Sequence, residues 1–365
     1  MVKNMSDTDR KEYEKALLHA EKGHEYITDA DLACLLETPA EEAAQLFELA
    51  AKKRQENFGD KVFLYGFVYF STYCRNNCSF CYYRQENHEP PRYRKSRGEI
   101  LSIARSLRDS GVHLLDLTMG EDPFYLNNGE TGFNQLKELI AEIKAATKLP
   151  LMISPGVIPP SVLDELQMAG GDWYALYQET HNKELYEKLR LKQPYIERWE
   201  KKEYARNHGW LVEEGLLVGL GETVSDLVRS LRIMEKLGAM QVRTMTFVPQ
   251  KGTPLGDVPA ISNQRELNLI AVMRLLMPER LIPASLDVEG VSGLKARLRA
   301  GANVVTSIIP PESGLAGVSN ATLDVAEGYR TVAGVTPILK ECGLRPAAGK
   351  EYEELLRYYR GGEKK

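Results

Sequence analysis

Three of the five cysteines lie within eight residues of the chain. Cys74, Cys78 and Cys81 form a C-x3-C-x2-C motif, whereas Cys34 and Cys342 lie far from it. A secreted disulfide framework would contain an even, spread set of cysteines, and a tight trio in a reducing compartment is typical of a metal site. Three thiolates can bind three irons of a four-iron cube and leave the fourth iron open for a reactant. The spacing therefore predicts a [4Fe–4S] cluster with one open iron.

A structural zinc ion is the alternative for this motif. Zinc would need a fourth ligand, and the nearest candidate is His88, seven residues after Cys81 in a polar, proline-rich segment. The motif also lacks the two C-x2-C halves of a zinc ribbon. An iron–sulfur cluster is therefore the favoured interpretation, and Cys34 is interpreted as a small apolar residue in the core.

The elements that must position the cysteines follow a regular alternation. Beyond residue 59, short β-branched and aromatic runs alternate with helical segments, which predicts parallel strands joined by right-handed crossovers. Eight runs over roughly 280 residues predict a (β/α)8 barrel of the TIM type, and an open doubly wound sheet is the alternative. Catalytic residues of such barrels lie at the C-terminal ends of the strands, and the cysteine trio directly follows the first run. The predicted strands are residues 62–70, 114–119, 150–156, 173–179, 210–220, 241–248, 281–288 and 303–309.

The barrel is predicted to occupy residues 58–345. It is preceded by an N-terminal helical extension, residues 1–57, and followed by a C-terminal helix or tail, residues 346–365. Within the extension, capping-box patterns at residues 28–31 and 38–41 predict the starts of two helices.

Composition narrows the functional classes. The net charge of -4, with 51 acidic against 47 basic residues and no long basic run, argues against a nucleic acid or an anionic membrane as partner. No stretch of about 18 apolar residues is present, so we expect no membrane span. The first residues, MVKNMSDTDRKEYEK, are too polar for a signal peptide, and we predict a cytoplasmic protein.

The motif directly after the first strand, with Phe80 before the third cysteine, resembles the radical S-adenosylmethionine (SAM) superfamily. The resemblance implies that the open iron chelates SAM, and that an electron from a low-potential donor cleaves SAM into methionine and a 5′-deoxyadenosyl radical. That radical removes a hydrogen atom from the substrate, so the cofactor supplies the chemistry and the protein positions and shields it. No catalytic side chain beyond the SAM-derived radical is implied.

Two further stretches resemble SAM-binding motifs of the superfamily. Gly120 and Glu121 stand where the superfamily has Gly-Gly-Glu, with Met119 in place of the first glycine. The stretch GLLVGLGE resembles G-x-I-x-G-x-x-E, and its matching glycine and glutamate are Gly219 and Glu222. For the second stretch, a glycine-rich strand end packed against a helix is the alternative.

Two single residues resemble SAM contacts of biotin-synthase-like enzymes. Glu179 corresponds to the acid that binds the ribose, because a carboxylate can accept hydrogen bonds from two hydroxyls. Arg198 corresponds to the arginine that binds the SAM carboxylate. A solvated helix charge is the alternative for Arg198.

Longer stretches resemble one family within the branch of biotin synthase and HydE, the methylornithine synthase (PylB) family of pyrrolysine biosynthesis. The matching stretches are CRNNCSFCYYRQENHEPPRYR, DLTMGEDP, RTMTFVPQKGTP and PASLDVEG. The resemblance implies an isomerase that converts L-lysine to (3R)-3-methyl-D-ornithine, by breaking the Cα–Cβ bond in a substrate radical and recombining the fragments at a different carbon.

The residues can be compared with that substrate. Lysine brings one carboxylate and two ammonium groups into the barrel, and each needs a complementary partner there. Arg243 interrupts an otherwise neutral predicted strand. Asp116 shares a predicted strand face with Thr118, and Ser285 shares one with Asp287. One arginine and two aspartates match the charged groups of lysine, and the resemblance places these positions in the substrate cavity. A structural Arg–Asp ion pair across the barrel is the alternative.

Two other functions stay open at this point. A HydE-like maturase acting on another small substrate would share the cluster and the SAM residues without needing a lysine-matched set of charges. A non-enzymatic iron–sulfur or zinc protein would not bind SAM.

Overall fold

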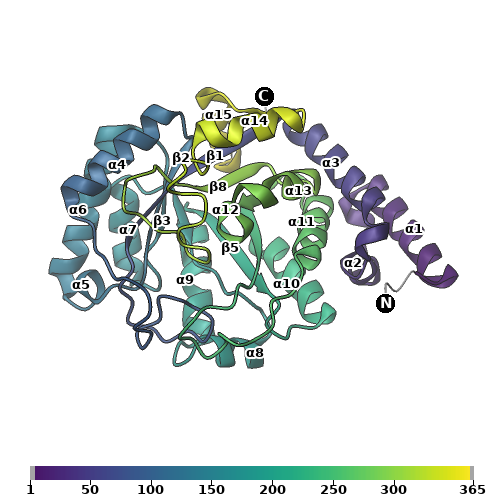
Figure 1. Cartoon of the computed structure of the whole chain (residues 1–365), viewed down its shortest axis with the longest axis horizontal. Coiled ribbons are helices and arrows are strands. Elements are labelled where there is room, and N and C mark those ends of the chain that lie inside the picture. The colour runs from purple at the N-terminus through teal and green to yellow at the C-terminus, as the bar shows by residue number, and fades with distance from the viewer. Residues whose placement is uncertain (1–4, 362–365) are drawn as a thin grey trace.

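The computed structural model describes residues 5–361 and contains an eight-stranded barrel with helices around it (Figure 1). The strands are β1 (Lys61–Ser71), β2 (Leu114–Met119), β3 (Leu151–Ser154), β4 (Trp173–Ala175), β5 (Leu211–Val218), β6 (Gln241–Thr246), β7 (Pro283–Ser285) and β8 (Val304–Ile308). Neighbouring strands are parallel, in the order β6-β5-β4-β3-β2-β1-β8-β7. The ring closes between β6 and β7, where the Leu281 N–H donates to the Met240 carbonyl at 3.0 Å. The predicted (β/α)8 barrel is confirmed, and the open-sheet alternative is wrong.

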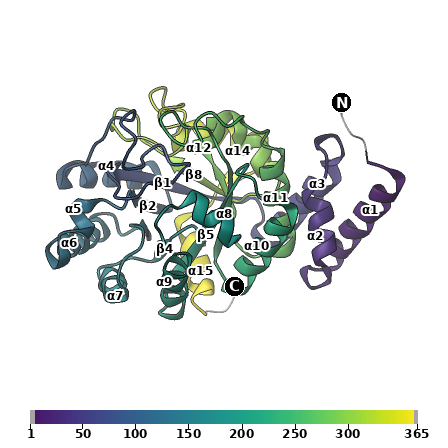
Figure 2. The same cartoon turned by 90° about the horizontal axis from the view of Figure 1, so that it is seen from below.

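Crossover helices cover the outside of the barrel (Figure 2). They are α4 (Arg97–Ser110), α6 (Gly129–Thr147), α7 (Pro160–Met168), α9 (Tyr195–Asn207), α10 (Val224–Leu237), α11 (Gln264–Leu276), α13 (Leu294–Arg299) and α14 (Val332–Glu341), with the short α5 (Pro123–Leu126), α8 (Lys183–Leu189) and α12 (Leu286–Glu289). In α4, Ser96 caps the first turn and residues at three- and four-residue spacing, from Ile100 to Leu107, are buried. This amphipathic pattern places α4 against β1.

The N-terminal extension forms α1 (Asp7–Lys22), α2 (Asp29–Leu36) and α3 (Ala44–Phe58), which lie beside α10 and α11 (Figures 1 and 2). Its capping box at residues 28–31 is confirmed at the start of α2. Docking of the extension explains why α11 is buried from Glu266 to Leu276, since α11 lies between the barrel and α2 and α3. The Asn268 side chain joins the two parts by donating to the Leu36 and Thr38 carbonyls at 3.1 and 2.8 Å.

The predicted capping box at residues 38–41 is wrong. The Thr38 hydroxyl donates to the Cys34 carbonyl at 3.4 Å instead of accepting from a following N–H group. The next residue, Pro39, has an extended backbone with ψ of 153°, so a helix cannot begin there. A short 3-10 turn follows at Ala40–Glu42, and α3 begins only at Ala44.

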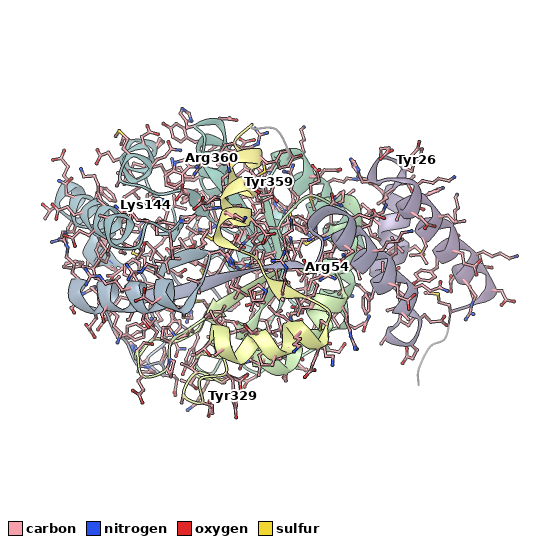
Figure 3. The ribbon with its side chains drawn as sticks, turned by 90° about the horizontal axis from the view of Figure 1, so that it is seen from above. Tyr26, Arg54, Lys144, Tyr329, Tyr359 and Arg360 are labelled. Atoms are coloured by element: carbon pink, nitrogen blue, oxygen red, sulfur yellow. The ribbon has the colours of Figure 1, made fainter. Side chains whose placement is uncertain are left out.

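The C-terminal helix α15 (Gly349–Tyr359) closes the amino-terminal end of the barrel (Figure 3). A short strand, β9 (Arg345–Pro346), pairs with the start of β1 and leads into this helix. The Tyr352 hydroxyl lies 2.8 Å from that of Tyr65, among aromatic and aliphatic side chains from the first residues of the strands. Residues 362–365 lie outside the described part of the chain. With one end filled, a cavity inside this barrel lies towards the C-terminal ends of the strands.

Most predicted strands are shorter in the structure, and the fourth and seventh lose the most. The fourth ends at Ala175, although Glu179 returns to pair with Leu216 of β5. The seventh ends at Ser285, whose hydroxyl accepts the Asp287 N–H at 3.2 Å and so caps α12. Ser285 and Asp287 therefore do not share a strand face, because the chain turns into a helix between them.

Candidate active site

The three cysteines lie in the loop between β1 and α4, at the C-terminal end of β1. Burial, followed by the neighbouring Cys78 thiol, raises the pKa of Cys74 to about 11. Burial and the two other thiols raise the pKa of Cys81 as well. Thiols crowded in this way ionise when a cation takes the place of their protons, as the irons of a cluster would. The three side chains thus fit the iron–sulfur group that their spacing predicts.

No three His, Cys, Asp or Glu side chains among residues 5–361 converge closely enough to hold a single metal ion. A four-iron cube is wider than one ion, so its thiolates stand further apart than the ligands of zinc do.

One side chain that the sequence reasoning missed fixes the shape of this loop. Arg92 is half-buried, and its guanidinium donates to the Thr72, Tyr83, Arg84 and Asn87 carbonyls at 2.5 to 3.0 Å. Four carbonyls from both sides of the cysteine motif are thereby held by one planar group. No motif marks Arg92, since only the folded loop brings its partners together.

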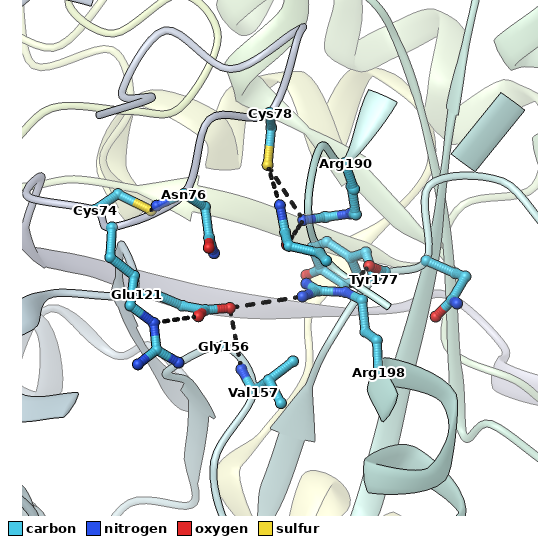
Figure 4. A network of polar contacts seen from close by, with 12 residues as sticks. Cys74, Asn76, Cys78, Glu121, Gly156, Val157, Tyr177, Arg190 and Arg198 are labelled. Carbon is cyan, nitrogen blue, oxygen red and sulfur yellow. Dashed lines mark hydrogen bonds and ion pairs between the residues drawn. The ribbon is translucent and has the colours of Figure 1, made fainter. Parts of the chain in front are cut away.

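Donors from the β4–α9 region face the Cys78 sulfur (Figure 4). The Gln193 side-chain amide lies 3.1 Å from this sulfur and the Arg190 guanidinium 3.7 Å from it. The other Arg190 amino group donates to Glu179 at 2.6 Å, and its guanidinium lies over the Phe80 ring at 5.5 Å. Arg190 therefore links the cysteine loop to a predicted SAM residue, although it stands in no motif.

Glu121 joins three loops at the same end of the barrel (Figure 4). Its carboxylate accepts from Arg75 at 3.0 Å and from the Val157 N–H at 3.2 Å, and it lies 3.8 Å from Arg198. Next to it, Gly120 is required by close packing, because a Cβ there would lie 2.2 Å from the Tyr73 carbonyl oxygen. The loop after β2 thus packs directly against the cysteine loop.

Glu179 and Arg198 lie near this junction. Glu179 has a backbone φ of +66°, a left-handed conformation that residues other than glycine rarely adopt. Arg198 is buried on α9 and donates to the Tyr177 carbonyl at 2.7 Å, so the solvated-charge alternative is wrong. One of its amino nitrogens has no hydrogen-bond partner among the described residues. Such a group suits an anionic ligand.

The structure separates Gly219 and Glu222 from these residues. Glu222 accepts from the Gly219 and Leu220 N–H groups at 2.9 Å and from Arg265 at 3.1 Å, and so stabilises the turn after β5. Gly219 faces a groove beside the N-terminal extension rather than the cysteine loop. These contacts match the alternative interpretation of a glycine-rich strand end, while Leu217 of the same strand faces the barrel cavity.

The cavity of about 130 Å³ lies inside the C-terminal end of the barrel, next to the cysteine loop. All three charged residues predicted to bind the substrate line it, together with side chains from the cysteine loop and from most strands. The lining includes Phe67, Phe80, Cys81, Tyr82, Asp116, Thr118, Ser154, Tyr177, Glu179, Leu217, Arg243, Met245, Phe247, Val248, Gln250, Asp287, Val318 and Ser319. The predicted cofactor residues Phe80 and Glu179 thus share one cavity with Asp116, Arg243 and Asp287.

The two arginines of this region are paired with acids inside the protein. Arg243 donates to Glu213 at 2.8 Å, and Arg330 donates to Asp287 at 2.7 Å. The structural Arg–Asp ion pair of the alternative interpretation is present for Asp287, which pairs with Arg330, whereas Arg243 pairs with a glutamate. The sequence reasoning missed both Glu213 and Arg330. Glu213 lies on a predicted strand whose residue pattern does not identify Arg243 as its partner. Arg330 lies in a loop 43 residues after Asp287 in the chain.

Asp116 differs from the other acids. It accepts from the Thr118 hydroxyl at 2.8 Å, as their predicted common face implies, but no basic side chain of residues 5–361 forms an ion pair with it. Burial, and then the negative charge of Glu213, raise the pKa of Asp116 to about 7. Ser285 does not line the cavity, since its hydroxyl caps α12 behind Asp287.

Comparison with known proteins agrees with this arrangement. Residues 68–234 match the model of the radical SAM superfamily. The chain is 42% identical to 3-methylornithine synthase of Methanosarcina acetivorans over 98% of its own length and 100% of that protein, and 31% identical to the [FeFe] hydrogenase maturase subunit HydE of Thermotoga maritima over 71% of its length and 74% of that protein. A crystal structure of methylornithine synthase (PylB) superimposes with a TM-score of 0.87 at 43% identity, covering 92% of this chain and 99% of that one.

Radical SAM proteins use a [4Fe–4S] cluster and SAM, and the thiols and polar groups at this end of the barrel fit both. The near-complete coverage and the shared barrel extend the relationship from the cysteine loop to the whole catalytic domain. The chain is therefore a member of the 3-methylornithine synthase family of radical SAM enzymes.

Proposed function

We propose that this chain isomerises L-lysine to (3R)-3-methyl-D-ornithine, with SAM bound to a [4Fe–4S] cluster on Cys74, Cys78 and Cys81. The assignment of lysine as the substrate is supported by the charge balance of the cavity and of the residues paired with its lining. Asp116, Asp287 and Arg243 line the cavity, and Glu213 and Arg330, outside its lining, pair with Arg243 and Asp287. These are three acids against two guanidinium groups, and Glu179, which also lines the cavity, is balanced by Arg190. One negative charge is left over, and lysine carries one net positive charge at neutral pH.

The positions of the charges suit the two ends of lysine. One amino nitrogen of Arg243 is buried without a hydrogen-bond partner among the described residues, and Arg243 lines the cavity. A guanidinium presents its remaining N–H groups as a planar fork that matches a carboxylate. Asp116 and Asp287 line the same cavity and can accept from ammonium groups. We infer that Arg243 holds the α-carboxylate and that the two aspartates hold the amines.

The cavity also suits a reaction in which the substrate breaks into two fragments. When bound, SAM at the reduced cluster supplies a 5′-deoxyadenosyl radical that removes and later returns a hydrogen atom. The chain must keep both fragments in place and exclude water. Val318 and Ser319, from the loop after β8, line the cavity, and the Gln250 side chain donates to the Ser319 carbonyl at 3.1 Å. This contact joins two of the loops that line the cavity.

The test is anaerobic incubation of the reconstituted protein with SAM, dithionite and L-lysine. Methylornithine is an isomer of lysine, so the product is separated by chromatography and followed with isotope-labelled lysine. A labelled product that co-elutes with 3-methylornithine is expected, and D-lysine, L-ornithine and a Cys78→Ala variant serve as controls. Reductive SAM cleavage without any product from lysine would overturn the assignment and favour a different small substrate.

We also infer a cytoplasmic protein that receives its electrons from a low-potential donor. A cluster with an open iron needs a reducing compartment, and the distribution of cysteines supports such an address. No helix within residues 5–361 is long and apolar enough to cross a bilayer.

A further inference from the structure

A buried ion pair lies on the outer side of the barrel, behind the residues assigned to SAM. Lys202 of α9 and Glu214 of β5 form a close ion pair, and both side chains are fully buried. Glu213 points into the barrel towards Arg243, so its neighbour Glu214 points outward, as the alternation of a strand requires. Neither Lys202 nor Glu214 lines the cavity, so substrate binding does not explain the pair.

Glu214 replaces part of the hydrogen-bond ladder between β4 and β5. Strand β4 ends at Ala175, and the Gln178 N–H then donates to the Glu214 carboxylate at 2.7 Å. One residue later the ladder resumes, because the Glu179 N–H donates to the Gly215 carbonyl at 3.1 Å. The left-handed backbone of Glu179 thus lies directly after a residue whose N–H is held by Glu214. Such strained conformations persist where surrounding contacts over-determine them.

Lys202 connects the same segment to α9. Its ammonium group donates to the Gln178 side-chain oxygen at 2.8 Å as well as to Glu214. Arg198 stands one turn earlier on the helix and donates to the Tyr177 carbonyl at 2.7 Å. The Gln178 side-chain amide also donates to the Tyr195 carbonyl of α9 at 3.2 Å. Helix α9 is therefore attached to residues 177–178 by three hydrogen bonds, and a shift of this segment would move both Glu179 and Arg198.

We propose that the Lys202–Glu214 pair is a positioning device for SAM, which fixes the strand end that carries Glu179 to the helix that carries Arg198. This inference rests on the proposed assignment of those two residues to SAM, and it does not depend on the substrate. A charged pair suits the task better than an apolar contact, because one carboxylate holds a backbone N–H and the ammonium group together. A buried Lys202 ammonium or Glu214 carboxylate without its partner would destabilise the folded protein. Separation of the strand end from helix α9 is therefore unfavourable.

The test compares Glu214→Gln and Lys202→Met with the natural protein. SAM affinity is measured by equilibrium dialysis on anaerobic protein with a full cluster, and the melting temperature is measured in parallel. We expect the SAM dissociation constant to rise roughly tenfold. Uncoupled SAM cleavage at saturating SAM should change much less, since Glu179 and Arg198 are displaced but not removed. Glu179→Ala must also weaken SAM binding, and if it does not, the assignment of Glu179 has failed rather than the positioning.

The matched control is Glu266→Gln. Glu266 of α11 forms a buried ion pair with Arg297 of α13 and accepts from the Thr246 N–H at 2.8 Å at the end of β6. Like Glu214, it is a buried, ion-paired glutamate that holds a backbone N–H at a strand end, but it lies on a helix and contacts neither Glu179 nor Arg198. The Glu266→Gln variant should lower the melting temperature about as much as Glu214→Gln does, while leaving SAM affinity unchanged. If Glu214→Gln and Glu266→Gln give the same pattern, the pair is only structural and the proposal is wrong. Should the ion-pair variants fail to fold, Gln178→Met is the deciding variant, because it leaves Lys202 and Glu214 in place and removes the side-chain contacts of Gln178 to Lys202 and to the Tyr195 carbonyl of α9. SAM binding that weakens severalfold supports the proposal, and unchanged SAM binding overturns it.

Discussion

The two walls of the cavity are built differently. On the cofactor wall, Arg75, Arg190 and Arg198 reach across loops to Glu121, Glu179 and the Cys78 sulfur, so cations are gathered around the place that negatively charged thiolates and the SAM carboxylate would occupy. On the substrate wall, Arg243 and Arg330 are each paired with an acid of the protein, and Asp116 forms no ion pair within residues 5–361. The cofactor wall thus has three arginines against the two acids Glu121 and Glu179, whereas the substrate wall has two arginines against three acids. The first balance suits ligands of negative charge, and the second suits the cationic substrate proposed above.

The largest expected effect follows from replacing the three cysteines of the cofactor wall. Cys74→Ala, Cys78→Ala and Cys81→Ala should each abolish the iron–sulfur absorbance and SAM cleavage, because each is expected to bind one iron. Iron analysis and SAM cleavage under anaerobic conditions are the measurements. Cys34→Ala and Cys342→Ala are the matched controls and should keep both. Loss of the cluster in the Cys342 variant, with its retention in the Cys78 variant, would show that the site is misassigned.

The next test separates the walls. Arg243→Lys keeps the charge but loses the planar fork, and it should lower kcat/KM for lysine by roughly 30-fold or more, since breaking a buried, hydrogen-bonded charge pair costs about 2–5 kcal/mol. Cluster content and SAM affinity should stay unchanged. Because Arg243 also pairs with Glu213, Glu213→Gln measures the structural share of the effect. If lysine-free SAM cleavage declines along with the melting temperature in both variants, the pair is structural and the substrate role of Arg243 is lost.

A smaller effect is expected on the other wall. Glu179→Ala should weaken SAM binding by about 1–3 kcal/mol, the usual cost of leaving a buried polar partner unsatisfied. The cluster should survive, since Glu179 is not one of its predicted ligands. Arg190, its partner at 2.6 Å, remains beside Cys78 in this variant, which makes iron content a sensitive control. Unchanged SAM affinity would remove Glu179 from the site.

The two walls also differ in how far the sequence reveals them. The cysteine trio, Gly120 and Glu121 are predictable because they stand in short motifs, each directly after a predicted strand. The partners Arg190, Gln193 and Arg330 are not, because each is brought to its acid or sulfur only by the folded loops. Ser285 and Asp287 are a second example, in which the sequence pattern predicts a shared strand face that the structure does not have. Their spacing suits a strand, but one capping hydrogen bond turns the chain into α12.

The smallest effect, and the one most specific to the substrate wall, is a pH dependence. With the pKa of Asp116 raised to about 7, half of the free enzyme holds this carboxyl protonated at neutral pH, whereas both lysine amines are charged. An ammonium group binds the ionised form, so kcat/KM for lysine should rise about tenfold between pH 6 and pH 8. The affinity for SAM should not follow this profile. Asp116→Asn should flatten it at a low value, which distinguishes Asp116 from other titrating groups.

The stability of the free enzyme should change with pH in the opposite direction, because it should fall as the pH rises while kcat/KM for lysine increases. A carboxyl whose pKa is raised on folding holds its proton in the folded state between about pH 4 and pH 7, where the unfolded chain has released it. Its contribution is therefore full at low pH and is lost as the pH rises through 7, so buried Asp116 weakens the free enzyme at pH 8. Asp116→Asn, which cannot ionise, should melt at a higher temperature than the natural protein at pH 8 and lose this advantage near pH 4. Lysine should raise the melting temperature of the natural protein more at pH 8 than at pH 6, because its ammonium group supplies the missing partner. Equal stabilisation by lysine at both pH values would mean that Asp116 does not hold the substrate and that its charge does not select lysine.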